Sequence, residues 1–106
     1  VRPIDYPVKA VATEYADFCF SSANLTSLGV PIDSDLHIIG AQPVVDSGSA
    51  KYVHHFLVTA SVVDNCGDMS TFNDVAFVWA PGEGPLILPP NVGALLGSQG
   101  FKAFNV

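Results

Sequence analysis

Short apolar runs, rich in Val, Ile and Phe, alternate along the chain with clusters of Pro, Gly, Asp and Ser. Runs of this kind bounded by turn residues predict β-strands, and no segment shows the sustained period of about 3.6 residues that predicts a helix. The pattern therefore predicts an all-β fold, built as a single β-sandwich or jelly-roll domain. We expect strands at residues 8–13, 15–20, 36–39, 42–45, 52–63 and 75–79, with weaker candidates at 86–88 and 101–106.

The longest expected strand, residues 52–63, carries the most information about orientation. Its even positions are mostly apolar, while its odd positions include Thr59 and Ser61. Successive side chains of a strand point to opposite faces, so the even positions are expected to face the core. The neighbours His54 and His55 then point apart, and they can share a metal ion only where a bulge, a bend or the end of the strand brings them together.

Length and charge narrow the range of functions. The 106 residues suit one domain with a modest core, and ten acidic against four basic residues give a formal net charge of −6. No basic face is available to neutralise phosphates, so nucleic acid is not expected as a partner. Only 13% of the residues are charged and the mean hydropathy is +0.39, a balance that favours self-association. A membrane span is not expected, because Gly and Pro interrupt the longest uncharged stretch, residues 84–101.

The two cysteines, Cys19 and Cys66, fit a single disulfide bond, although two buried free thiols would also account for them. Asn24-Leu25-Thr26 is an acceptor sequence for N-linked glycosylation at Asn24. Together these features favour a secreted, extracellular glycoprotein, since disulfides persist in oxidising compartments. The sequence begins at Val1 without a leader-like segment, so we expect that any signal peptide has been removed or lies outside this sequence.

The adjacent histidines His54 and His55 are the clearest candidates for chemistry. Neutral imidazoles suit copper or zinc, but two of them do not make a tight site, and His37, Met69 or a carboxylate would be needed as a further ligand. A structural interpretation, with His54 hydrogen-bonded in the core and His55 on the surface, stays open. Trp79 is most simply a core aromatic residue, with sugar stacking as its alternative. No catalytic residue is assigned, because no paired carboxylates or activated nucleophile stand out.

Several short segments occur in the order found in one known family. They are Asp17-Phe18-Cys19, Leu36-His37-Ile38-Ile39-Gly40-Ala41-Gln42-Pro43, Val53-His54-His55-Phe56, Val78-Trp79-Ala80-Pro81-Gly82 and Leu88-Pro89-Pro90-Asn91-Val92-Gly93. From about Phe18 to Val106, the chain resembles the N-terminal part of the copper type II ascorbate-dependent monooxygenases, whose members include dopamine β-monooxygenase and the peptidylglycine hydroxylating enzyme. The resemblance implies a jelly roll, and it implies that His54 and His55 are two of the three histidine ligands of an electron-transferring copper.

Three departures from the family pattern limit what the resemblance implies. The family's third histidine follows a strand that residues 101–106 resemble, and the sequence ends where that histidine would come. The second copper domain, which carries the substrate-oxidising metal, has no counterpart here. A family cysteine beyond the histidine pair is replaced within Thr59-Ala60-Ser61, so the pairing of Cys19 with Cys66 rests on their number alone. Hydroxylation by this chain alone is therefore not expected.

Two functions are consistent with these features. In the first, residues 1–14 form an N-terminal extension whose strand docks on residues 15–106 of a neighbouring copy, which gives a homo-oligomer or a filament with a structural, non-catalytic role. In the second, the chain is a fragment of a copper- and ascorbate-dependent monooxygenase and supplies part of its electron-transfer copper site. A third candidate is a module that binds a single copper or a small ligand through His37, His54 and His55.

Overall fold

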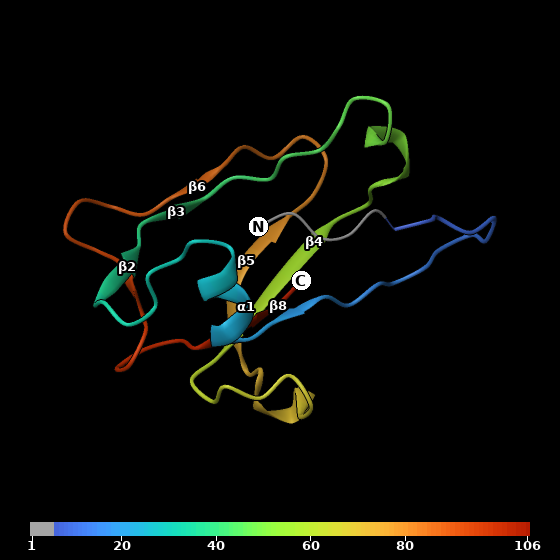
Figure 1. Cartoon of the computed structure of the whole chain (residues 1–106). Helices are drawn as coiled ribbons and strands as arrows, with labels where there is room; N and C mark the ends of the chain where they lie inside the picture. The colour runs from blue at the N-terminus through green and yellow to red at the C-terminus, as the bar shows by residue number, and fades with distance from the viewer. Residues whose placement is uncertain (1–5) are drawn as a thin grey trace.

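Four short antiparallel strands form the larger sheet of the computed structural model, which describes residues 6–106. Across this sheet the order is β1 (Cys19–Phe20), β8 (Ala103–Asn105), β4 (Phe56–Ser61) and β5 (Asp74–Trp79). β4 lies inside the sheet, while β5 forms one edge (Figure 1). Leu57 of β4 lies opposite Val78 of β5, and Thr59 lies opposite Asn105 of β8. β4 is thus paired on both sides.

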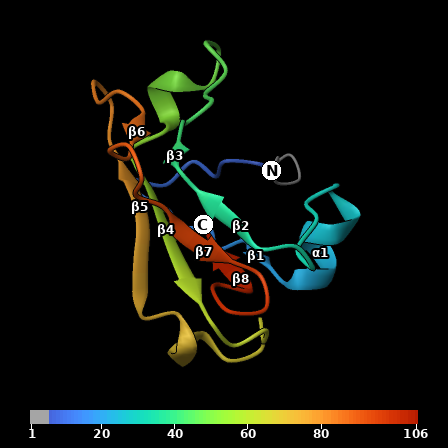
Figure 2. The same cartoon turned by 90° about the vertical axis from the view of Figure 1, so that its left-hand side faces the viewer.

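A second layer consists of a two-stranded ribbon. In it, β2 (Leu36–Ile38) pairs with β7 (Ala94–Leu96), and β3 (Gly40–Ala41) pairs with β6 (Leu86–Ile87). The Leu88 amide donates a hydrogen bond of 2.9 Å to the Ile39 carbonyl and links the two pairs. Figures 1 and 2 show the ribbon on one side of the larger sheet, as in a sandwich. The all-β prediction is confirmed.

Three short helical segments connect the strands: α1 (Ser22–Ser27), η1 (Ala50–Tyr52) and η2 (Met69–Thr71). α1 begins with a capping box, in which the Asn24 amide donates to Ser21 Oγ at 3.3 Å and the Ser21 amide donates to Asn24 Oδ1 at 3.0 Å. The sequence pattern did not predict α1, because a helix of six residues is too short to show a helical period.

The core is small and gathers around α1. Its buried centre consists of Leu25 of α1, Ile32 and Leu96 of β7, whose exposed fractions are 4%, 8% and 7%. Partly buried apolar side chains pack around this centre: Phe20, Val30, Leu36, Ile38, Phe101 and Phe104. None of these residues comes from β3 or β6, so the core lies at the β2–β7 end of the ribbon.

The strands are shorter than the sequence predicts. Residues 42–45 were predicted as a strand but form none, and Pro43 has no amide hydrogen to donate to a partner. The strand predicted at residues 52–63 is reduced to β4, since Tyr52 belongs to η1 and residues 53–55 and 62–63 form no strand. Of the strand predicted at residues 15–20, only β1 is formed. The three-residue strand β7 was missed, since so short a run shows no clear alternation.

The predicted alternation along β4 holds only in part. Phe56 and Val58 are partly buried, Ala60 is fully buried, and the intervening Leu57 is exposed. Ser61 is fully buried on the side expected to be polar and exposed. The cause lies in the neighbouring strands, because the register with β5 shifts after Val58 and β8 covers the end of β4.

The first described residues do not form the strand predicted at residues 8–13. Instead, Lys9 Nζ and Glu14 Oε1 form an ion pair of 2.7 Å across a bend at residues 10–12. The hydrogen bond from Lys9 also lowers the pKa of the Glu14 carboxyl group. The rest of the predicted extension, residues 1–5, lies outside the described residues.

The chain exposes more surface than its mass predicts. Its accessible area is 7360 Å², whereas a monomer of 11.1 kDa is expected to expose about 5,700 Å². The radius of gyration is 14.5 Å, against about 13 Å expected for this length. Large apolar side chains that are exposed include Val8, Val11, Tyr15, Ile39, Val44, Tyr52, Val75 and Ile87. Among the described residues, no helix has both the length and the apolar character needed to cross a membrane.

Candidate metal-binding site

The two adjacent histidines lie just before β4 and not within it. The chain leaves η1 through Val53 in an extended conformation, and the strand begins at Phe56, so His54 and His55 occupy the end of the strand. Their ring centroids are 5.2 Å apart, with the ring planes inclined by 58°. Both side chains are exposed, so the prediction that His54 faces the core is wrong. The structure meets the strand-end condition under which neighbouring histidines can approach each other.

This spacing is compatible with one metal ion between the two rings. Metal–nitrogen bonds of about 2.0 Å place an imidazole centre about 3 Å from the ion, so two rings on one ion have centres about 4–6 Å apart. The observed 5.2 Å falls within this range. The exposed position of both rings also leaves space for further ligands.

Tyr15 forms an aromatic wall beside the pair. Its ring centroid lies 5.8 Å from that of His55, with an interplanar angle of 54°. Tyr15 comes from the segment that precedes β1 and is itself 74% exposed. Sequence reasoning missed this neighbour, because no motif links two residues so far apart in the chain. The contact restricts the orientations open to the His55 ring.

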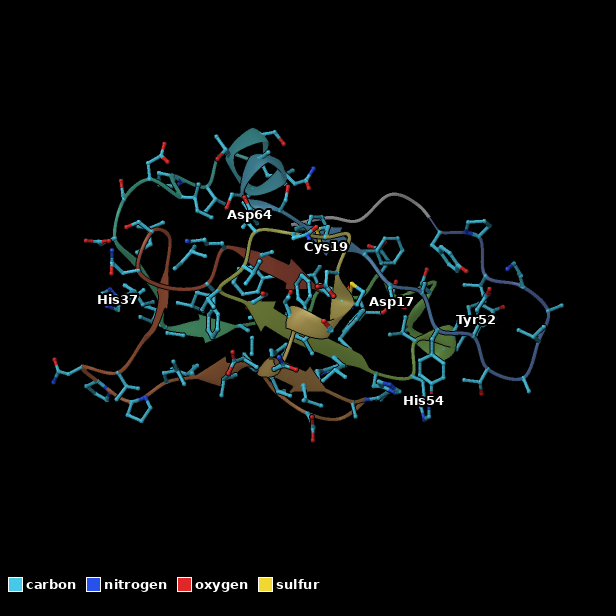
Figure 3. All side chains as sticks on the ribbon, turned by 90° about the horizontal axis from the view of Figure 1, so that it is seen from below. Asp17, Cys19, His37, Tyr52, His54 and Asp64 are labelled. Atoms are coloured by element: carbon cyan, nitrogen blue, oxygen red, sulfur yellow. A yellow bond between two sulfur atoms is a disulfide. The ribbon has the colours of Figure 1, made fainter. Side chains whose placement is uncertain are left out.

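The other candidate ligands do not reach the pair. Figure 3 shows His37 and His54 on opposite sides of the molecule. Met69 belongs to η2, which follows β4, so the whole strand of six residues, about 20 Å, separates it from the histidines. Within residues 6–106, no three His, Cys, Asp or Glu side chains form a metal-binding group. The structure therefore does not form the three-histidine module considered above.

The comparisons with known proteins identify the family. The model of the family described as copper type II ascorbate-dependent monooxygenase, N-terminal domain, matches residues 6–106. The chain belongs to this family. The match confirms the resemblance drawn from the short motifs. No curated protein and no solved structure matches the chain.

The donor atoms of the histidine pair suit the metal of the copper monooxygenase family. Neutral imidazole nitrogens are ligands that copper accepts readily, and the ring separation allows both to bind one ion. Two imidazoles make an incomplete donor set for copper. His54 and His55 therefore fit copper as a half-site, to which the described residues add no third histidine.

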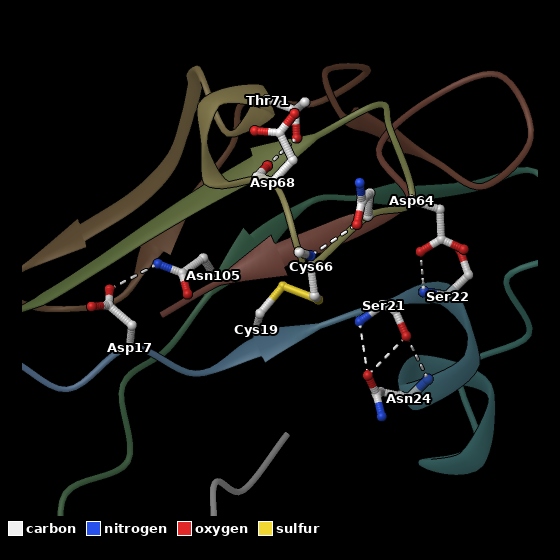
Figure 4. Close-up of a disulfide and its surroundings, with 12 residues drawn as sticks. Asp17, Cys19, Ser21, Ser22, Asn24, Asp64, Cys66, Asp68, Thr71 and Asn105 are labelled. Atoms are coloured by element: carbon white, nitrogen blue, oxygen red, sulfur yellow. Dashed lines mark hydrogen bonds between the residues drawn. A yellow bond between two sulfur atoms is a disulfide. The ribbon is translucent and has the colours of Figure 1, made fainter.

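A disulfide joins the two cysteines, Cys19 of β1 and Cys66 of the loop after β4 (Figure 4). Its sulfur atoms are 2.05 Å apart, and the Cα atoms are separated by 5.7 Å. A second link in this region is a hydrogen bond of 2.8 Å that the Ser22 amide donates to Asp64 Oδ1. The sequence pattern did not predict it. Both links fasten the beginning of the domain to the loop that follows β4.

The glycosylation sequence lies on α1, where Asn24 is exposed. Asn24 Oδ1 accepts hydrogen bonds from the amide and the hydroxyl group of Ser21, at 3.0 and 2.8 Å. Figure 4 shows the side-chain nitrogen of Asn24, the atom that would carry a glycan, pointing away from these bonds. A glycan on this nitrogen is therefore compatible with the capping box.

Proposed function

We propose that His54 and His55 hold a copper ion as two of its ligands, and that the chain contributes this half-site to an ascorbate-dependent monooxygenase system. The observation that supports the proposal is the 5.2 Å separation of two exposed imidazole rings at one strand end, in a member of a copper-dependent family. Copper bound there would supply one-electron chemistry, by cycling between its two common oxidation states.

In this proposal, the residues of the chain hold the copper ion and orient its imidazole ligands, and they do not themselves react with a substrate. Each imidazole offers one nitrogen lone pair to the metal, and Tyr15 packs beside His55 and limits the rotation of its ring. Because both rings are exposed, a third ligand and an electron donor can approach from solvent or from another polypeptide segment. We propose that the chain does not hydroxylate a substrate by itself, since the family's substrate-oxidising copper belongs to a second domain.

Alanine in place of either His54 or His55 is expected to weaken copper binding by about tenfold or more, because each substitution removes one of two ligands. Copper(II) can be titrated against a weak competing chelator and followed by the fluorescence of Trp79, the single tryptophan of the chain. Trp79 packs against Phe56 with ring centroids 5.5 Å apart, and Phe56 follows His55 directly, so a bound copper would quench the emission of Trp79.

The matched control is His37→Ala, which removes an exposed imidazole distant from the pair (Figure 3). This variant is expected to bind copper as tightly as the unaltered chain. Equal affinities in all three histidine variants would exclude the pair as the binding site.

We also propose that the chain self-associates, because its exposed area exceeds the expected value by about 1,700 Å². A stable interface needs about 800 Å² from each partner.

The register of β4 and β5 gathers Leu57, Val75 and Val78 on one face, where they are 46%, 62% and 55% exposed. β5 is also the edge of the larger sheet, and residues 8–13 form no strand within their own chain. Pairing of this segment with β5 of a neighbour would build a filament.

Purified chain is expected to form oligomers or filaments as its concentration rises, as measured by sedimentation velocity and electron microscopy. Val78→Lys is expected to shift the onset of association to at least about tenfold higher concentration, because it places a charge on the edge strand. Val92→Lys, at a position 50% exposed in the loop before β7, serves as the control and should associate normally. A chain that stays monomeric at every concentration would remove this proposal.

We further propose that the protein is secreted and carries a glycan at Asn24. The disulfide and the exposed, outward-pointing side-chain nitrogen of Asn24 support this. After passage through a eukaryotic secretory pathway, the chain should lose mass on treatment with an enzyme that removes N-linked glycans. Asn24→Gln should show no such loss, and an unchanged mass in the unaltered chain would speak against the site.

A further inference from the structure

A shallow cavity of about 280 Å³ lies where β5 ends and the chain turns toward β6. Polar and apolar groups share its walls, which include one indole, one carboxylate and one amide and are formed by Gln42, Pro43, Val45, Trp79, Glu83, Gly84 and Pro85. The cavity lies at the same end of β4 and β5 as the histidine pair, because Trp79 pairs with Phe56. None of the lining residues is a histidine, so it is distinct from the candidate metal site.

Trp79 is one of the residues that line this cavity. Its indole Nε1 donates a hydrogen bond of 2.8 Å to the Glu83 carbonyl, so the polar atom of the ring is already satisfied. The ring also packs against Phe56, with centroids 5.5 Å apart and an interplanar angle of 31°. Two contacts thus fix the position of the indole at the cavity wall.

Glu83 gives the cavity a negative charge. Its Oε2 accepts a hydrogen bond of 3.1 Å from the Ala80 amide, which holds the carboxylate at the turn after β5. None of the described residues that line the cavity is basic, so nothing in its wall balances this charge. The formal net charge of the chain, −6, adds to the attraction for cations and repels anions.

We propose that this cavity binds a small organic cation bearing a quaternary ammonium group. An aromatic face beside an unbalanced carboxylate attracts a cation through the ring quadrupole and through charge. Pro43, Val45 and Pro85 offer apolar contacts to the methyl groups of such a cation, and the Glu83 carboxylate offers the opposite charge. The volume lies near the lower limit of about 300 Å³ for ligand pockets, so one headgroup fits and a larger molecule would protrude. This site is independent of copper binding.

The probe is choline, and its matched control is 3,3-dimethylbutan-1-ol, which has the same shape without the charge. Trp79 is the single tryptophan, so its fluorescence reports binding directly when a chelator removes copper. We expect a saturable change with choline at millimolar concentration, and at least threefold weaker binding of the uncharged alcohol. Equal binding of the two ligands, or no saturable change with choline, would overturn the proposal without bearing on the histidine pair.

Glu83→Gln tests the carboxylate, because the amide oxygen can still accept the hydrogen bond from Ala80. We expect this variant to bind choline about threefold to tenfold more weakly and the alcohol unchanged. Asp33→Asn removes the same charge from an exposed turn outside the cavity and should leave choline affinity nearly unaltered. If both variants weaken choline binding equally, the net charge of the chain explains the effect, and the proposal that choline binds in this cavity is overturned. The comparison of the two ligands on the unaltered chain remains decisive if Glu83→Gln does not fold.

Discussion

Replacing both Cys19 and Cys66 by serine is expected to lower the free energy of unfolding by about 4 kcal/mol. The disulfide spans a sequence separation of 47 residues, so its removal returns much conformational entropy to the unfolded chain. The fold has little to offset this loss, since the buried apolar centre is confined to a few side chains and β1, which carries Cys19, has only two residues. Small domains have total stabilities of about 5–15 kcal/mol, so the double variant should be close to unfolding.

Chemical denaturation followed by Trp79 fluorescence measures this difference, with the oxidised and reduced forms of the unaltered chain compared alongside the variant. A reducing agent should bring the unaltered chain down to the stability of the double-serine variant and should leave that variant unchanged. If reduction and substitution both leave the transition in place, the disulfide does not stabilise the fold.

Gly100→Ala is expected to destabilise the domain by at least about 2 kcal/mol. A Cβ atom added at Gly100 would collide with the backbone carbonyl group of Leu95, which cannot rotate away as a side chain could. That carbonyl already accepts a hydrogen bond of 2.8 Å from the Phe101 amide, and the Gly97 amide donates one of 2.9 Å to the Phe101 carbonyl. Relief of the collision would therefore open the turn that joins β7 to β8, next to the core residue Leu96.

Gly48→Ala is the matched control, because a Cβ atom there would meet no other atom within 4 Å. This variant should be as stable as the unaltered chain or more stable by a few tenths of a kcal/mol, since alanine restricts the unfolded chain. Thermal unfolding of both variants by circular dichroism gives the comparison. Equal midpoints for Gly100→Ala and Gly48→Ala would show that the close approach at Gly100 is not required.

The class of fold could be predicted from local pattern, while the strand boundaries could not. The alternation of Phe56, Val58 and Ala60 identified β4, because these side chains face other parts of the same domain. The pattern failed at Ser61, where pairing with β8 buries a polar side chain whose hydroxyl accepts a hydrogen bond from the Val63 amide at 3.0 Å. Residues distant in the sequence thus decide where a strand ends, and the pattern of apolar residues within the strand does not indicate them.

The histidine pair shows the same limit for the site. The sequence indicated His54 and His55 as ligands, and the structure places their rings 5.2 Å apart. Whether the two rings could approach each other depended on where the strand begins, and it begins at Phe56, directly after His55. The contact of Tyr15 with His55 depends on the path of a segment without regular structure, which no periodicity predicts.

Pulsed electron paramagnetic resonance of the copper(II)-loaded chain is the most direct measurement of the central claim, since it counts the imidazoles that bind the metal. We expect two imidazoles in the unaltered chain, one in His54→Ala, one in His55→Ala, and two in His37→Ala. A spectrum without two imidazoles in the unaltered chain, or one that is unchanged when His54 or His55 is removed, would contradict it.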